Sequence, residues 1–106
     1  MPTRLEVIQK LVAEQPDDAF RRYGLALELK NSGRLDEAAA EFAELERRRP
    51  EYVAQYLMHG NLLSSLKRRD EARAVLERGI AVATKARDNH ALGELRGALE
   101  ALEADD

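Results

Sequence analysis

The chain has 106 residues, of which 44% are hydrophobic and 35% are charged, and only three are prolines. This length suits one small domain with a modest core, and the composition excludes both a disordered and a membrane-spanning chain. The absence of cysteine excludes disulfide frameworks and thiolate zinc sites. With a net charge of −3 the chain lacks an overall basic field, so nucleic-acid binding is not expected.

Residues 1–15 predict a single helix. Thr3 and Glu6 have the spacing of a capping box, and Pro16 ends the helix shortly after Glu14. Between them, apolar residues recur at helical spacing: Leu5, Ile8, Leu11 and Val12. The segment lacks the uninterrupted apolar centre of a signal peptide, so we expect a cytoplasmic protein.

Residues 16–50 predict two helices joined by a tight turn. Asp17 or Asp18 is expected to cap the first helix, Gly33 to supply a left-handed turn residue, and Asp36 to cap the second helix. The packing faces carry Leu25, Ala26 and Leu29 on the first helix and Ala38, Phe42 and Leu45 on the second. The small residues Ala26 and Ala38 predict a close approach of the two helices.

This segment half repeats when it is shifted by thirty-four positions. Pro16 then falls on Pro50, Leu29 on Leu63, Arg34 on Arg68, and Asp36-Glu37-Ala38 on Asp70-Glu71-Ala72. A period of this length marks an array of helical repeats. The spacing of Leu25-Ala26, Leu29, Gly33, Leu35, Ala38, Phe42, Leu45 and Pro50 resembles the tetratricopeptide repeat (TPR), a helix–turn–helix unit.

The second unit departs from the TPR pattern in three places. Lys67 replaces the turn glycine, Arg69 replaces the apolar residue matched by Leu35, and Thr84 stands where a third proline would fall. The turn at Lys67 is therefore less sharply defined by sequence, and the second helix of this unit is expected to continue to about Arg87. A final helix follows, with Leu92, Leu95, Leu99 and Leu102 along one face, and resembles the capping helix that closes TPR arrays.

The resemblance implies an all-α fold, a TPR-like right-handed superhelix fragment of about six antiparallel helices in a single domain. We expect a partial repeat at 1–15, repeats at 16–50 and 51–86, and a capping helix with an acidic tail at 87–106. The predicted helices span 3–14, 18–31, 36–48, 52–66, 70–86 and 89–103.

The resemblance also implies a non-enzymatic module that binds a protein or peptide partner, without cofactor, in the groove lined by the first helices of the repeats. The residues expected on that inner face are Phe20, Tyr23, Leu27, Leu57 and Asn61. The Lys, Asn and Arg clamp by which chaperone-binding TPR proteins hold a terminal carboxylate is absent, because the best-matching places carry Tyr23, Leu27, Met58, Asp88 and Leu92. Two alternatives stay open: the apolar stripe is core, or it pairs two copies in a homodimeric scaffold.

Other candidate sites have structural explanations. His59 and His90 do not form an HExxH pattern, and we expect His59 between the helices of the second unit and His90 in the first turn of the last helix. The basic clusters 47–49 and 67–69 fall at a helix C-terminus and in a turn, where cations are common. Either cluster is also suited to an acidic segment of a protein partner.

Overall fold

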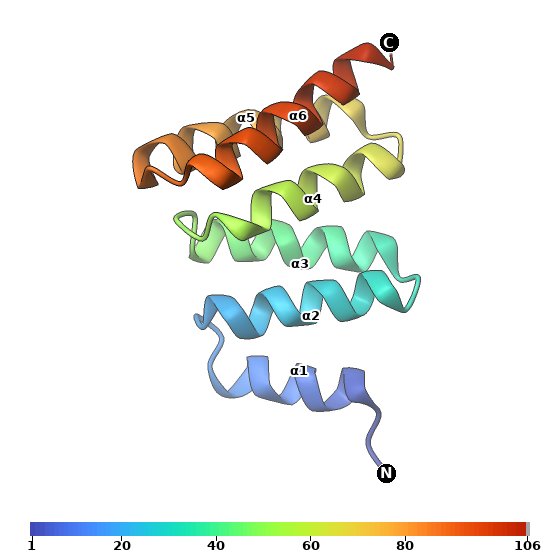
Figure 1. Ribbon diagram of the computed structural model, residues 1–106. Coiled ribbons are helices and arrows are strands. Elements are labelled where there is room, and N and C mark those ends of the chain that lie inside the picture. The colour runs from blue at the N-terminus through green and yellow to red at the C-terminus, as the bar shows by residue number, and fades with distance from the viewer. Residues whose placement is uncertain (106) are drawn as a thin grey trace. The chain divides into compact units, whose positions relative to one another are not determined.

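The computed structural model describes residues 1–105, and this part of the chain forms six helices and no strand (Figure 1). The prediction of an all-α helical repeat fold is confirmed, and each predicted boundary lies within one turn of the observed one. The helices are α1 (Arg4–Glu14), α2 (Ala19–Asn31), α3 (Leu35–Arg48), α4 (Ala54–Ser65), α5 (Arg69–Ala86) and α6 (Asn89–Ala104). Among these described helices, none has the length and apolar character needed to cross a bilayer. Asp106, the end of the predicted acidic tail, lies outside the described residues.

The chain divides into two compact units, Met1–Tyr52 and Val53–Asp106. In the first unit α2 packs against both α1 and α3, and in the second unit α4, α5 and α6 all contact one another. Helices that follow each other in sequence run antiparallel within each unit because the connections between them are short (Figure 1). Each unit therefore builds its own core from helix pairs.

Two of the predicted helix starts are confirmed and a third is wrong. The Thr3 hydroxyl accepts a hydrogen bond from the Glu6 backbone while the Glu6 carboxylate accepts one from the Thr3 backbone, which completes the capping box. Asp18 caps α2 by accepting from the backbone N–H of Arg21 at 3.0 Å. Asp36, however, lies inside the first turn of α3, whose N-cap is Arg34. Its carboxylate there complements the positive end of the helix dipole.

The turn at Gly33 explains why α3 begins early. Gly33 has φ 78°, and the backbone N–H of Arg34 donates back to the carbonyl oxygen of Leu29 at 2.9 Å. This Schellman turn closes α2 and directs the chain straight into α3. Lys67 keeps the same geometry at the end of α4, with φ 64°, although a side chain in this region is disfavoured.

Small residues allow close helix contacts in both units. Ala26 and Ala38 are fully buried between α2 and α3, as the sequence predicts. In the second unit, a Cβ atom built on Gly60 would lie 2.4 Å from Cδ2 of Leu76, and Ala72 is fully buried. The helix backbones approach each other where no larger side chain fits.

Two residues of the second unit that depart from the repeat pattern form hydrogen bonds within that unit. Arg69 is half-buried, and its Nη2 donates to the carbonyl oxygen of Leu102 at 2.7 Å, near the end of α6. Thr84 does not interrupt α5, because unlike a proline it keeps its backbone N–H, and its hydroxyl donates to the carbonyl oxygen of Ile80 at 2.7 Å. The prediction that this helix continues to about Arg87 is confirmed, since α5 ends at Ala86.

Candidate functional site

Phe20 is the most exposed aromatic residue of the predicted inner face. It lies in the first turn of α2, two residues after the Asp18 cap that fixes the start of the helix. Its side chain is 75% exposed, although transfer of a benzyl group out of water is favourable. An aromatic ring left in solvent on a rigid helix is suited to contact a partner.

Tyr23 lies one turn later and is only half-buried. Its ring meets Phe42 edge-on at a centroid distance of 6.2 Å and lies 5.5 Å from the ring of Tyr52. Burial raises the pKa of the Tyr23 phenol, with a smaller contribution from Tyr52. Tyr23 therefore supports the packing of α2 on α3 and keeps part of its surface in solvent.

Leu27 lines a groove of about 370 Å³ between α1 and α2, and Phe20 lines the same groove. The α1 side of this groove is formed by Arg4, Ile8 and Leu11, and Gly24 opens its α2 side. The structure thus brings Phe20 and Leu27 together on one surface, whereas Tyr23 faces α3. The sequence shows the helical spacing of the α1 residues but does not indicate that they form a surface with α2.

Leu57 and Asn61 lie on α4 in the second unit. Leu57 is half-buried and Asn61 is exposed, so the amide group of Asn61 is accessible for hydrogen bonding. Both occupy repeat-equivalent places to Tyr23 and Leu27, one period later in the sequence. A joint binding surface of all five residues stays a prediction.

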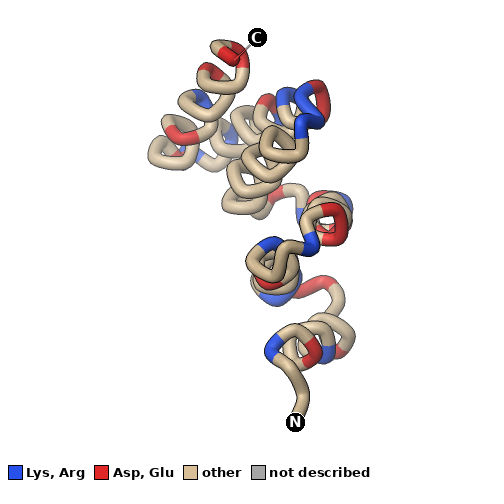
Figure 2. Tube along the Cα trace, turned by 90° about the vertical axis from the view of Figure 1, so that its right-hand side faces the viewer, with Lys and Arg blue, Asp and Glu red and all other residues tan. Residues whose placement is uncertain are grey.

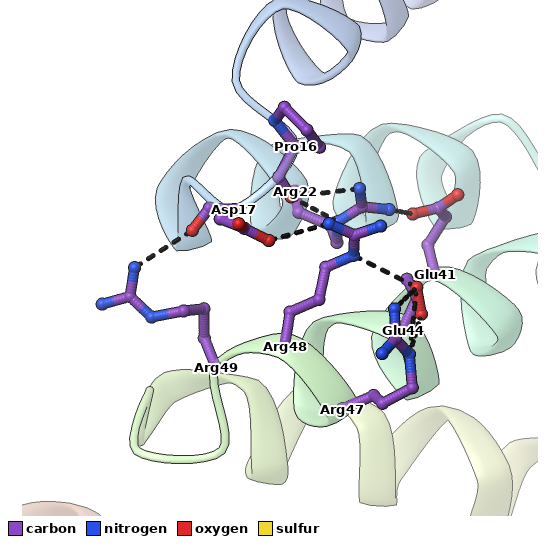
Figure 3. A network of polar contacts seen from close by, with 8 residues as sticks. All are labelled: Pro16, Asp17, Arg22, Glu41, Glu44, Arg47, Arg48 and Arg49. Carbon is purple, nitrogen blue, oxygen red and sulfur yellow. Dashed lines mark hydrogen bonds and ion pairs between the residues drawn. The ribbon is translucent and has the colours of Figure 1, made fainter.

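The basic cluster 47–49 is held by acidic groups of its own unit (Figure 3). Arg48 bridges Oδ1 of Asp17 at 2.7 Å and Oε2 of Glu44 at 3.2 Å, while Arg49 donates to the carbonyl oxygen of Asp17 at 3.0 Å. Hydrogen bonds from Arg47 and then Arg48 lower the pKa of Glu44 to about 2. This cluster ties the end of α3 to the start of α2, which favours its structural reading.

Arg22 is a buried cation that sequence reasoning did not single out. Its guanidinium bridges Oε2 of Glu41 on α3 at 2.8 Å and donates to the carbonyl oxygen of Pro16 (Figure 3). Charge-assisted bonds of this kind compensate the loss of water around a buried charge. Arg22 therefore fixes the loop before α2 against α3.

The second basic cluster, 67–69, is also engaged within its own unit. Arg68 pairs with Glu71 at 2.6 Å, and Arg69 binds carbonyl oxygens near the end of α6. Acidic and basic residues are interspersed along the helices of both units (Figure 2). The charged side chains thus form mixed networks within each unit.

The two histidines lie where the sequence predicts. His59 is 5% exposed in the interior of the second unit, and His90 lies in the first turn of α6, exposed, with Nε2 3.2 Å from Oε1 of Glu94. Within residues 1–105, no three His, Cys, Asp or Glu side chains gather as a potential metal site.

Comparison with known proteins identifies the repeat. The tetratricopeptide repeat model matches residues 56–85. The solution NMR structure of a TPR domain protein from Salinibacter ruber is 35% identical, with a TM-score of 0.82, and the match covers 87% of this chain and 93% of that one. A crystal structure of the TPR domain protein from the same organism is also 35% identical, with a TM-score of 0.80, and covers 84% of this chain and 100% of that one.

A more distant structure shares the fold alone. The TPR2B domain of yeast Sti1, in its complex with pHsp70, is 15% identical with a TM-score of 0.88, and the match covers 96% of this chain and 82% of that one. Among curated proteins, none has a matching sequence.

Proposed function

The chain belongs to the tetratricopeptide repeat family, and from this premise we propose that it is a non-enzymatic module that binds a peptide or helix of a protein partner. The contact residues in this proposal are Phe20, Tyr23 and Leu27 on α2 together with Leu57 and Asn61 on α4. The observation that carries the proposal is the 75% exposure of Phe20 on the face that also presents Leu27. The pHsp70 complex of the Sti1 domain supports it as a related fold that binds a protein ligand.

The chemistry of these residues favours an apolar segment over a charged peptide terminus. Phe20 and Leu27 offer apolar contacts, and aromatic anchors commonly supply much of the binding free energy. Asn61 offers both a donor and an acceptor, which suits hydrogen bonding to a peptide backbone. The expected ligand is therefore an amphipathic helix or an extended apolar segment.

Selection of peptides from a displayed library on the immobilised full chain provides a ligand for a direct test. The affinity of a selected peptide would be measured by fluorescence anisotropy for the wild type and for Phe20→Ala, Tyr23→Ala and Asn61→Ala. Phe20→Ala should weaken binding by more than about 1 kcal/mol without changing the urea midpoint, because the ring is mostly exposed. Val7→Ala on α1, which removes another exposed apolar side chain, is the matched control.

Tyr23→Ala is a second readout with a different expectation. It should weaken peptide binding and also lower stability, since its ring contacts Phe42 and Tyr52. Peptide binding unchanged in all three site variants would place the interaction elsewhere. Sedimentation equilibrium over a range of concentrations distinguishes partner binding from self-association. A dimer that Phe20→Ala dissociates would replace the partner-binding proposal with a homodimeric scaffold.

A further inference from the structure

The groove between α1 and α2 is lined by residues whose repeat equivalents in the second unit are covered by a helix. Its α1 wall consists of Arg4, Ile8 and Leu11. One repeat period later these places carry Ala38, Phe42 and Leu45 on α3, and two periods later Ala72, Leu76 and Gly79 on α5. On α3 and α5 all of these later residues are buried, and the helices that pack on them are α2 and α4 respectively.

The space around two glycines shows how closely α4 packs on the equivalent surface of α5. A Cβ built on Gly79 would lie 2.5 Å from Cβ of Tyr56 on α4 and 3.0 Å from Cδ2 of Leu95 on α6. A Cβ built on Gly60 of α4 would meet Leu76 at 2.4 Å. Both α4 and α6 therefore pack closely on this part of α5.

The α2 wall of the groove corresponds in the same way to α6. Gly24, Leu27 and Asn31 stand two periods before Leu92, Leu95 and Leu99. Leu95, the equivalent of Leu27, is 1% exposed at the junction with α4 and α5. The pair α1 and α2 thus repeats the pair α5 and α6, but among residues 1–105 no helix occupies the place that α4 has in the second unit.

The apolar residues of α1 are more exposed than their repeat equivalents, as expected if no helix covers the groove. Leu11 is 38% exposed and Ile8 is half-buried, whereas their equivalents Leu45 and Leu76 are at most 1% exposed. Gly24 has open space at its Cβ position, where α6 carries Leu92. The groove is therefore open where the second unit is filled, and Ile8, Leu11, Phe20 and Leu27 give it apolar surface.

We infer that the α1/α2 groove binds an amphipathic helix of a partner protein, which packs there as α4 packs on α5 and α6. The register of α4 defines the chemistry of that helix: a large apolar residue, a small residue four positions later and a large apolar residue three positions after that, as in Tyr56, Gly60 and Leu63. Arg4 and Glu28 also line the groove and form a salt bridge of 3.1 Å, so polar residues should flank this stripe.

A second copy of this chain is a poorer occupant. At the places of Tyr56, Gly60 and Leu63, the final helix α6 carries His90, Glu94 and Gly97, which lack both large apolar residues. The corresponding face of α2 is already packed on α3, and that of α4 on α5. The inference goes beyond the proposed function, because it adds the α1 residues of the groove as a contact surface and shares only Phe20 and Leu27 with the proposed site.

The probe for a test is a synthetic peptide of residues 53–66 with added helix-favouring ends, together with a peptide of the same composition in which the apolar register is scrambled. The helix content of both would be matched by circular dichroism, because short helices are marginal in water. Binding to the full chain would be measured by anisotropy, and amide shifts would locate the site. The register peptide should bind and shift α1 and α2, while the scrambled peptide should bind at least about tenfold more weakly.

Two variants fill or disrupt the groove without disturbing the core. Gly24→Leu fills open space in the groove and should weaken peptide binding at least about tenfold, and Leu11→Glu should weaken it as much. Gly93→Leu on α6 is the matched control, because it also adds a leucine at an unobstructed glycine but lies outside the groove. Val7→Ala removes an exposed apolar side chain of α1 that does not line the groove, and it should leave binding of this peptide unchanged. Absent binding, shifts confined to α5 and α6, or a homodimer that Gly24→Leu dissociates would each overturn the inference.

Discussion

Gly79→Ala tests the convergence of three helices in the second unit. In an open helix this substitution raises stability by about 1 kcal/mol, because alanine restricts the unfolded chain and favours helix. At Gly79, however, the added methyl carbon would lie 2.5 Å from Cβ of Tyr56, where ordinary contacts begin near 3.4 Å. The Tyr56 Cβ is fixed to its backbone and cannot rotate away, so α4 must shift by roughly 1 Å, and overpacking of this kind costs about 1–3 kcal/mol.

Gly93→Ala provides the matched control, since nothing lies within 4 Å of a Cβ at that position of α6. We expect Gly93→Ala to raise the free energy of unfolding. The free energy of unfolding of Gly79→Ala should be lower than that of Gly93→Ala by about 1–3 kcal/mol, which is the cost of overpacking. Urea titrations followed by circular dichroism would give both values if the slopes are equal. An equal rise in both variants would refute the close approach of α4 to α5.

Three further predictions concern stability. Lys67→Gly should raise the free energy of unfolding by about 1 kcal/mol, measured as a higher urea midpoint, because glycine removes the strain of a left-handed lysine at φ 64°. Ala38→Leu should cost about 1–3 kcal/mol in the same assay, while Ala40→Leu on the exposed side of α3 should change it by less than about 0.5 kcal/mol. Because its two arginine partners lower the pKa of Glu44 from 4.5 to about 2, this carboxylate contributes stability above pH 4.5 that is lost as the pH falls towards 2. As the pH is lowered from 6 to 2, the urea midpoint should therefore fall less steeply for Glu44→Gln than for the wild type.

Features that depend on neighbours in sequence were predictable. The capping box of Thr3 and Glu6 and the turn at Gly33 are local, since the groups that bond lie within five residues of each other. The error at Asp36 is local as well. Arg34 and Asp36 both follow the turn and can each be read as the cap, and the Schellman geometry at Gly33 places the start of the helix directly after Arg34.

Features that depend on the packing of distant segments were not predictable in the same way. The helical spacing of Phe20, Tyr23 and Leu27 placed them on one side of α2, but it could not show that Tyr23 meets Tyr52. The groove likewise requires α1 to lie beside Gly24, a residue that sequence periodicity marks only as a weak helix former. Repeat equivalence could have pointed to this groove, because Leu11 precedes two buried residues by one and two periods.

Amide chemical-shift mapping on the full chain with a peptide selected from a displayed library tests the central claim most directly. If the first helices of the repeats form the binding surface, the largest shifts should fall on α2 around Phe20 and Leu27 and on α4 around Leu57 and Asn61. Shifts concentrated on α3 and α5, with these four positions unchanged, would contradict it.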